Sequence, residues 1–214
     1  MASDVVLDHA SAADSPAIRT VLARAYRTNP LMVWALPDDG TRQDACAAWL
    51  GPSVDRYLAV GRVHVARVAG RVVGVAAWRL PGAATPPESL PTPAGVLAAL
   101  VGRARADGIL SALGSAAPLA PGSPAAYLNY LAVDPDLQGR AIGRSLAEAG
   151  IGAADADGLG TYLGTTDPRN LPFYRRLGYV DAGAVPLGPD GPVLVVLHRA
   201  QAAASSANHM TVSP

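Results

Sequence analysis

Two stretches in the second half of the chain combine residue types that can do chemistry. The first, Leu131 to Arg144, has the sequence LAVDPDLQGRAIGR, and the second, Asp167 to Tyr179, has the sequence DPRNLPFYRRLGY. The second contains Tyr174, whose phenol has an ordinary pKa of about 10 and can donate a proton to a departing group of similar basicity. The first passes from an apolar strand pattern through small residues into a helical pattern, which is an arrangement that can hold an anion.

The turn in the first stretch favours a pyrophosphate as its ligand. Backbone N–H groups and the positive end of the helix dipole meet there, and small residues such as Gly139 let a phosphate come close. The turn has neither the GKS or GKT ending of a P-loop nor the three-glycine spacing of a dinucleotide fingerprint, which disfavours nucleoside triphosphates and NAD. Taken alone, it is equally compatible with a structural role, because glycine often only supplies a positive φ.

Apolar periodicity predicts the elements that position these two stretches. We expect strands at residues 5–7, 62–69, 71–80, 125–133, 159–164, 179–185 and 193–198, and helices at 11–27, 42–59, 94–114, 142–156 and 171–177. The pair Asn29-Pro30 is expected to break the first helix. Pro-rich residues 81–93 and 118–124 flank the 94–114 helix, and we interpret this region as an insertion or flap.

Length and composition favour one domain that does not bind nucleic acid or a membrane. The 214 residues suffice for a substantial core, and 17 Lys+Arg balance 17 Asp+Glu, so no general field draws the chain to a polyanion. The single cysteine, Cys46, lies in a helical pattern without metal-ligand spacing, so we expect a buried thiol and no metal site. We predict one domain over residues 1–199 and a disordered tail over residues 200–214. Without a signal-peptide or membrane-span pattern, the expected location is the cytoplasm.

Together and in this order, the two stretches resemble the signature segments of GNAT superfamily N-acetyltransferases. The first resembles the family pattern Gln/Arg-x-x-Gly-x-Gly/Ala, matched by Gln138 and Gly143, with Ala141 as a departure that can shift the phosphate cradle. The second resembles the family's Asn…Phe-Tyr-x-x-Leu-Gly-Phe/Tyr ending almost position for position. The resemblance covers residues 3 to 199, and it implies an α/β GNAT fold. In that fold a mixed, mostly antiparallel sheet is splayed at the cofactor strand 125–133 and flanked by helices.

The resemblance implies acetyl-CoA as co-substrate and a role for each matched residue. The acetyl and pantetheine groups would bind the backbone of Leu131, Ala132 and Val133 and the side chain of Asn170. The pyrophosphate would bind Gln138, Gly139, Arg140, Ala141, Ile142, Gly143 and Arg144. Tyr174 would be the general acid for the CoA thiolate. Two structural alternatives stay open, since Tyr174 can be a core residue and Asn170 can be the N-cap of the short helix.

The acceptor side is less specified. Within the superfamily, the Pro-rich segment and the run from Thr165 to Tyr174 resemble the puromycin N-acetyltransferase-like branch, which modifies small molecules including antibiotics. The acidic residue of that branch just before the run is Gly164 here, so the same acceptor is not implied. Aromatic and amide residues offer an acceptor pocket: Tyr26, Trp34, Trp78, Tyr127, Asn129 and Tyr130.

The sequence does not identify a general base, because no acid lies in the cofactor strand or in the strand that follows it. A water chain, an acceptor amine of lowered pKa, or a carboxylate such as Asp38 or Asp39 could accept the proton. His64 and His198 lie in strand patterns and are expected to be packed or surface residues rather than bases.

We therefore expect an acetyl-CoA-dependent N-acetyltransferase that acts on a small amine. Two alternatives remain: acetylation of a protein amine, and a non-catalytic acyl-CoA-binding or sensing module, which Ala141 and the missing carboxylate would suit. The sequence leaves open whether the chain forms a homodimer.

Overall fold

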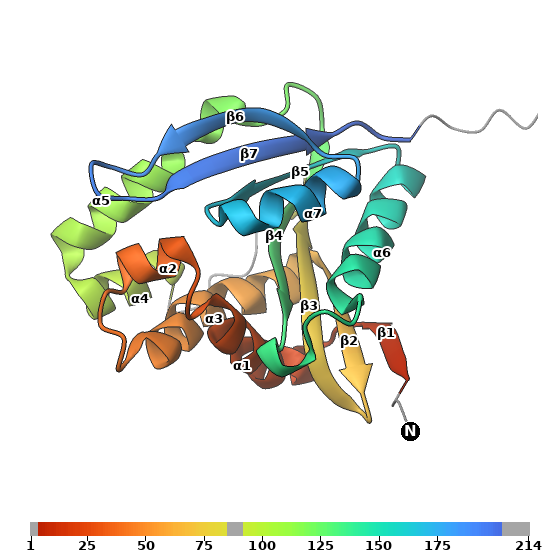
Figure 1. Cartoon of the computed structure of the whole chain (residues 1–214), viewed down its shortest axis with the longest axis horizontal. Coiled ribbons are helices and arrows are strands. Elements are labelled where there is room, and N and C mark those ends of the chain that lie inside the picture. Colours follow the sequence, from red (N-terminus) through yellow and green to blue (C-terminus); the bar gives the residue numbers. More distant parts are fainter. Residues whose placement is uncertain (1–3, 85–91, 203–214) are drawn as a thin grey trace, which may run out of the picture.

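The structure is a computed structural model that describes residues 4–84 and 92–202, and it is built on one seven-stranded sheet (Figure 1). The strands lie in the order β1-β2-β3-β4-β5-β7-β6. All neighbouring strands are antiparallel except the parallel pair β4 and β5. The strands are β1 (Val5–His9), β2 (Arg62–Val68), β3 (Arg71–Arg79), β4 (Ala125–Val133), β5 (Gly160–Thr165), β6 (Val180–Pro186) and β7 (Val193–Arg199).

Helices cover both faces of the sheet. They are α1 (Ser15–Tyr26), α2 (Pro30–Ala35), α3 (Arg42–Val60), α4 (Pro93–Val101), α5 (Arg103–Gly114), α6 (Ile142–Ala156) and α7 (Leu171–Arg176). Because side chains alternate along a strand, Val65 and Val75 face the core with α1, α3, α4 and α5, whereas Ala66 and Ala76 face the core with α6 and α7. Figure 1 shows α6 on one side of β4 and the helices α2 to α5 on the other. The predicted α/β architecture is confirmed.

Strand β4 loses one of its two partner strands part of the way along its length. Its first half pairs with β5 from Ala125↔Gly160 to Leu128↔Leu163, and that ladder then stops. Its second half remains paired with β3 on the other edge, up to Gly74↔Val133. On the β5 side, the backbone of residues 129–133 therefore has an open edge, which is the splay predicted for the cofactor strand.

Two helices differ from the sequence prediction. The segment 94–114 is divided into α4 and α5 at Gly102, whose φ of 81° lies outside the helical region. The pair Asn29-Pro30 breaks the first helix as expected, but it also starts α2. Proline is tolerated at a first helical position, and the Asn29 side chain caps the helix by accepting from the Leu31 N–H at 2.9 Å.

The predicted tail only partly overlaps the described residues. At residue 202 the backbone N–H of Ala202 donates to Asp155 at 2.9 Å, so the beginning of the tail is attached to α6. The disorder predicted for residues 203–214 lies outside the described residues, as do residues 85–91 of the Pro-rich segment.

Trp78 is a core residue that fixes the distance between α6 and the sheet. Its side chain is only 1% exposed, in the cluster formed with α6 and α7. An ideal Cβ on Gly150 would lie 2.1 Å from Trp78 Nε1, so only glycine lets α6 approach this closely. This placement corrects the expectation that Trp78 lines an acceptor pocket.

We predict that Gly150→Ala lowers the free energy of unfolding by about 1–3 kcal/mol, because the indole and helix must separate. Gly152→Ala is the matched control, since nothing lies within 4 Å of a Cβ there and alanine is the better helix former. It should stabilise the protein by up to about 1 kcal/mol. Urea unfolding measures both, and equal effects of the two substitutions would contradict this packing.

Candidate active site

A cavity of about 1080 Å³ opens where β4 separates from β5. Its walls come from the open edge of β4, the β4–α6 loop, α7, the ends of α1 and β5, and the helices α2, α3 and α5. This volume slightly exceeds the usual range for ligand sites, about 300–1,000 Å³. The cavity is therefore large enough for an extended ligand together with a second small molecule.

The β4–α6 loop presents backbone donors to one end of the cavity. Gly139 and Ala141 both have left-handed backbones, with φ of 78° and 61°, and α6 begins immediately after them at Ile142. The first N–H groups of a helix have no partner within the helix, so those of residues 142–144 are available to an anion. An added Cβ on Gly139 would meet nothing within 4 Å, which shows open space in front of the loop. These donors suit a pyrophosphate.

An ion-pair clamp from α1 holds this loop in place. Arg24 donates to Asp134 at 2.5 Å and to Asp136 at 2.8 Å, and Asp134 is nearly buried. The Asp134 side chain also accepts from the Asp136 N–H at 3.1 Å, and Gln138 donates to the Val133 carbonyl at 3.2 Å. Charged hydrogen bonds of this kind fix the loop before any ligand arrives.

The structure brings most of the predicted cofactor residues to the cavity. Lining it are Leu131, Ala132, Val133, Gln138, Gly139, Ala141, Ile142, Gly143, Arg144 and Asn170. Arg140 does not line it and is exposed. Asn170 precedes α7 but makes no side-chain cap, so its amide is free for a ligand.

Ala141 carries a strained backbone at the N-terminus of α6. A left-handed conformation costs a residue with a Cβ roughly 1–2 kcal/mol, a cost that glycine does not have. We predict that Ala141→Gly stabilises the protein by about 0.5–1 kcal/mol. The strain energy removed from the folded state exceeds the entropic cost of the more flexible glycine in the unfolded chain. Thermal unfolding measures this, and a destabilised variant would contradict the assigned backbone. CoA affinity, measured by calorimetry, should not fall.

Tyr174 reaches the cavity from α7 and is 8% exposed. Burial raises the pKa of the Tyr174 hydroxyl well above its ordinary value, and neighbouring Tyr26, Tyr179 and Tyr127 act in the same direction. The phenol therefore stays protonated at every physiological pH, which suits an acid and excludes a base. Edge-on packing against Phe173 and Tyr179, with ring centroids 5.2 and 6.0 Å away, holds the ring.

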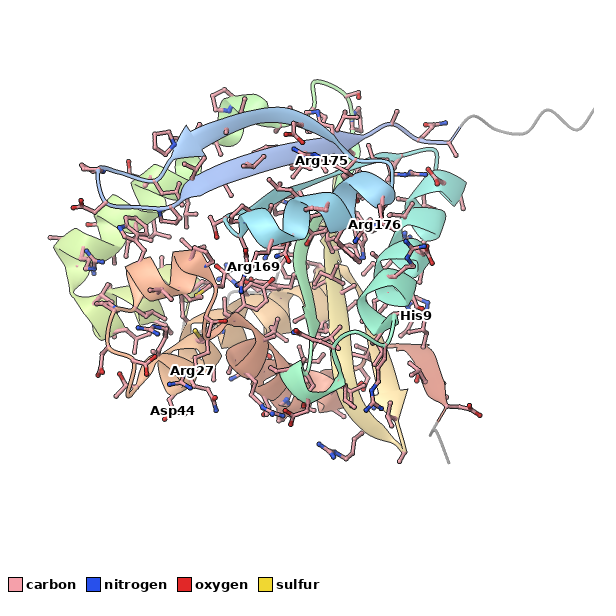
Figure 2. The ribbon with its side chains drawn as sticks, in the orientation of Figure 1. His9, Arg27, Asp44, Arg169, Arg175 and Arg176 are labelled. Carbon is pink, nitrogen blue, oxygen red and sulfur yellow. The ribbon has the colours of Figure 1, made fainter. Side chains whose placement is uncertain are left out.

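Asp167 is the one acid among the described residues that line the cavity, and it is already paired. Arg169 donates to it through Nε and Nη2 at 2.7–3.1 Å, and through its backbone N–H at 3.0 Å. These bonds hold the pKa of Asp167 below its ordinary range. Figure 2 shows Arg169 at α7, on the side that faces α1 and α2. Asp167 thus orders the turn before α7 and is a poor proton acceptor.

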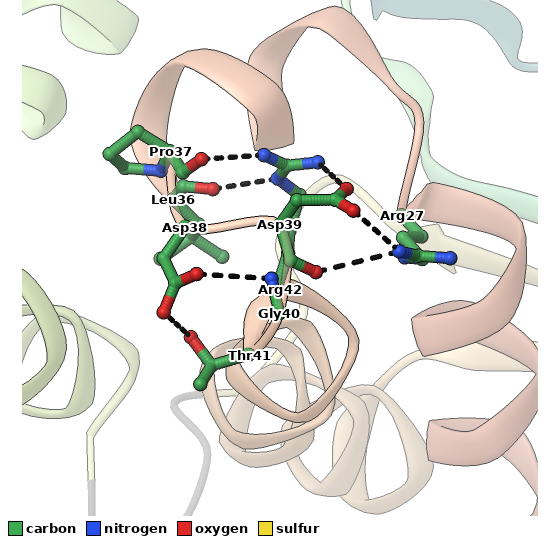
Figure 3. A network of polar contacts seen from close by, with 8 residues as sticks. All are labelled: Arg27, Leu36, Pro37, Asp38, Asp39, Gly40, Thr41 and Arg42. Carbon is green, nitrogen blue, oxygen red and sulfur yellow. Dashed lines mark hydrogen bonds and ion pairs between the residues drawn. The ribbon is translucent and has the colours of Figure 1, made fainter.

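The two carboxylates considered as bases from sequence lie in a separate network (Figure 3). Asp38 accepts from the Gly40 N–H at 3.0 Å and from Thr41 at 2.8 Å, and Asp39 pairs with Arg27 and with Arg42, each at 2.8 Å. Neither lines the cavity. Their structural task is to join the ends of α1 and α2 to the start of α3, and their position favours neither as the proton acceptor, a choice that the sequence left open.

The other predicted acceptor residues divide into two groups. Tyr26, Tyr127, Asn129 and Tyr130 line the cavity. Trp34 does not, since its half-buried ring packs against the core with the Arg105 guanidinium 5.8 Å from the ring centroid. The sequence reasoning missed Trp49 and Ser53 on α3, Leu110 and Leu113 on α5, and Leu194 on β7. Their local patterns are those of any amphipathic element, so only tertiary structure identifies them.

The two strand histidines named from the sequence, His64 and His198, and the cysteine Cys46 are packed, as expected. Burial lowers the pKa of His64 to about 4, and a ring nitrogen of His198 lies 2.7 Å from the Leu119 carbonyl oxygen. Cys46 is fully buried, and burial raises the pKa of its thiol to about 11. Among residues 4–84 and 92–202, no group of three or more His, Cys, Asp or Glu could hold a metal ion. In the same residues, no helix is long and apolar enough to cross a membrane.

Comparison with known proteins identifies the class that this fold and site define. The family model described as the Acetyltransferase (GNAT) family matches residues 41–179, so the chain belongs to that family of acetyltransferases. The match includes the whole of β4, the β4–α6 loop and α7. Membership implies acetyl-CoA as the co-substrate, and the donors described above fit its pyrophosphate and pantetheine arm.

Solved structures show the same fold over nearly the whole chain. A Corynebacterium glutamicum protein named as histone acetyltransferase HPA2 and related acetyltransferase is 26% identical, with a TM-score of 0.71 over 96% of this chain and 99% of that one. Arylalkylamine N-acetyltransferase 2 from Aedes aegypti is 11% identical, with a TM-score of 0.62 over 93% and 100%. The polyamine N-acetyltransferase of Drosophila melanogaster is 17% identical, with a TM-score of 0.55 over 91% and 99%.

Proposed function

We propose that the protein transfers the acetyl group of acetyl-CoA to the primary amine of a small molecule bound in the cavity between β4 and β5. The observation that carries this proposal is the arrangement around the open edge of β4. The helix N-terminus of α6 lies at one end of that edge, and the protonated Tyr174 lies beside it.

The chain's own groups account for binding. The backbone N–H and C=O groups of residues 129–133 that point away from β3 can hydrogen-bond the amides of the pantetheine arm as an added strand would. The amides of residues 139–144 and the Arg144 guanidinium can hold the pyrophosphate. The Asn170 amide extends the contact along the arm. These interactions hold the thioester at a fixed point on β4, next to the acceptor.

Tyr174 acts when the carbon–sulfur bond breaks. The neutral amine nitrogen bonds to the thioester carbonyl carbon, the sulfur leaves as thiolate, and the Tyr174 O–H gives its proton to that sulfur. The proton that the nitrogen loses returns to the phenolate through solvent. Burial raises the pKa of Tyr174, so the phenol keeps its proton until the thiolate forms.

Several features favour a small molecule over a protein as the acceptor. The helices α2, α3 and α5 contribute side chains to the cavity, so the acceptor end is lined by several elements besides β4 and α7. The neighbours named above include enzymes for arylalkylamines and polyamines, although the 26% identical one is named as a histone acetyltransferase. An antibiotic amine, as in the puromycin N-acetyltransferase-like branch, is one member of this class.

The test is acetyl-CoA-dependent thiol release over a panel of small amines and amine-bearing peptides. Release with one small-molecule class supports the proposal. Release with peptides alone would replace it with protein acetylation. CoA binding without release over the whole panel would favour a sensing module.

We predict that Tyr174→Phe lowers kcat by about a hundredfold or more, with unchanged affinity for acetyl-CoA, because only proton donation is lost. Since burial keeps the pKa of Tyr174 high, wild-type activity should not fall as the pH rises from 8 to about 10. Stopped-flow thiol release and calorimetry make these measurements.

The matched control is Tyr179→Phe, which removes a hydroxyl from the adjoining ring without touching the cavity. This variant should keep wild-type kcat. If the two variants lose activity equally, the loss reflects packing, and Tyr174 is not the acid.

A further inference from the structure

The cavity has an apolar end, away from the loop that suits pyrophosphate. Six large apolar side chains supplied by α2, α3, α5 and β7 line the cavity there, beside a few polar ones such as Ser53: Leu31, Met32, Trp49, Leu110, Leu113 and Leu194. We infer that the acceptor is an apolar primary monoamine, with a hydrocarbon or aromatic body that fills this end and a single amine directed at β4. This inference rests on the proposed acetyl transfer and specifies its substrate class.

The charges around the cavity oppose an acceptor with a second positive group. The described lining residues carry three arginines, Arg144, Arg169 and Arg176, against the single acid Asp167, which Arg169 already occupies. A second ammonium at the apolar end would therefore be desolvated without a free carboxylate among the described lining residues to pair with it. Polyamines and aminoglycosides are disfavoured on this ground, whereas a hydrocarbon chain has no second charge to desolvate.

The floor of this end is a rigid aromatic surface. The Tyr127 ring packs against Tyr162, with ring centroids 4.8 Å apart and ring planes tilted by 41°, and the Arg79 guanidinium lies 5.1 Å from the centroid of the Tyr127 ring. Further along β4, Tyr130 packs edge-on against Tyr26 and Tyr57, with centroids 6.2 and 5.9 Å away. Burial raises the pKa of Tyr127 to about 12, so this surface carries no negative charge at neutral pH.

Leu194 completes the apolar wall where a polar side chain could otherwise lie. An ideal Cβ on Gly164 would be 3.0 Å from Leu194 Cδ1 and 3.8 Å from the Tyr127 hydroxyl oxygen. Because Gly164 has no side chain, the Leu194 side chain from β7 occupies the space beside the end of β5. The body of the acceptor meets hydrocarbon at this point, close to where β4 and β5 separate.

Desolvation at the apolar end also favours the reactive form of the amine. Burial disfavours a charged ammonium, so the acceptor is held as the free base that can attack the thioester. An amine that is already the free base needs no carboxylate to deprotonate it before it attacks. This agrees with the lining of the cavity, where Asp167 is the sole carboxylate among the described residues.

The test compares kcat/KM for linear alkylamines from propylamine to hexylamine, and for hexylamine against hexamethylenediamine. Each methylene should raise kcat/KM about fourfold until the apolar end is full. Hexylamine should exceed the diamine by at least about tenfold. A flat series or a preferred diamine would overturn the inference while leaving acetyl transfer intact. Absence of turnover with every amine, despite CoA binding, would overturn the proposed function itself.

A matched pair of variants tests the charge argument. Leu194→Glu should raise the diamine-to-monoamine ratio of kcat/KM by about tenfold or more, because it supplies the missing counter-charge. Leu194→Gln has the same shape without the charge, and it should leave that ratio unchanged. Equal ratios in the two variants would contradict the inference.

One further control concerns Glu88, which lies outside the described residues. Glu88→Gln should leave the preference for hexylamine unchanged. A changed preference would mean that a carboxylate serves the acceptor end, and that would overturn the inference.

Discussion

The loss of pairing between β4 and β5 after Leu128 is the constraint on which the site depends. Backbone N–H and C=O groups away from water need partners, and in a regular sheet residues 129–133 would find them in β5. Here β5 separates from β4 after Leu163, while its other edge stays paired with β7 up to Thr165↔Val195. The open edge is therefore a row of prepared donors and acceptors, and an extended ligand with its own amides can complete it.

Polar contacts fix each side of this opening to a neighbouring helix. On one side, Arg24 binds Asp134 and so ties the loop after β4 to α1. On the other, the Asn29 side chain accepts from the Leu31 N–H and from the Thr166 hydroxyl, which joins the start of α2 to the end of β5. Because these contacts exist without a ligand, little ordering remains for binding to accomplish.

Much of this arrangement could be predicted from the sequence because it is local. Period-two runs define the strands, and the loop and the Asn170–Tyr174 segment mark the cofactor side. The acceptor side could not be predicted in the same way, because it is assembled from α2, α3, α5 and β7. Trp78 is an example, because the sequence does not show on which face of the sheet an aromatic side chain of a strand lies. A bulge between Ala77 and Trp78 and the glycine at position 150 place it in the core.

Amide hydrogen exchange with and without acetyl-CoA tests the central claim most directly, because it reports on the backbone groups that the open edge is said to offer. We predict strong protection by acetyl-CoA at residues 139–144 and at the amides of residues 129–133 that point away from β3, with little change at residues 125–128, which β5 already pairs. Protection confined to other elements, or protection of those β4 amides without ligand to the level of residues 125–128, would contradict this account.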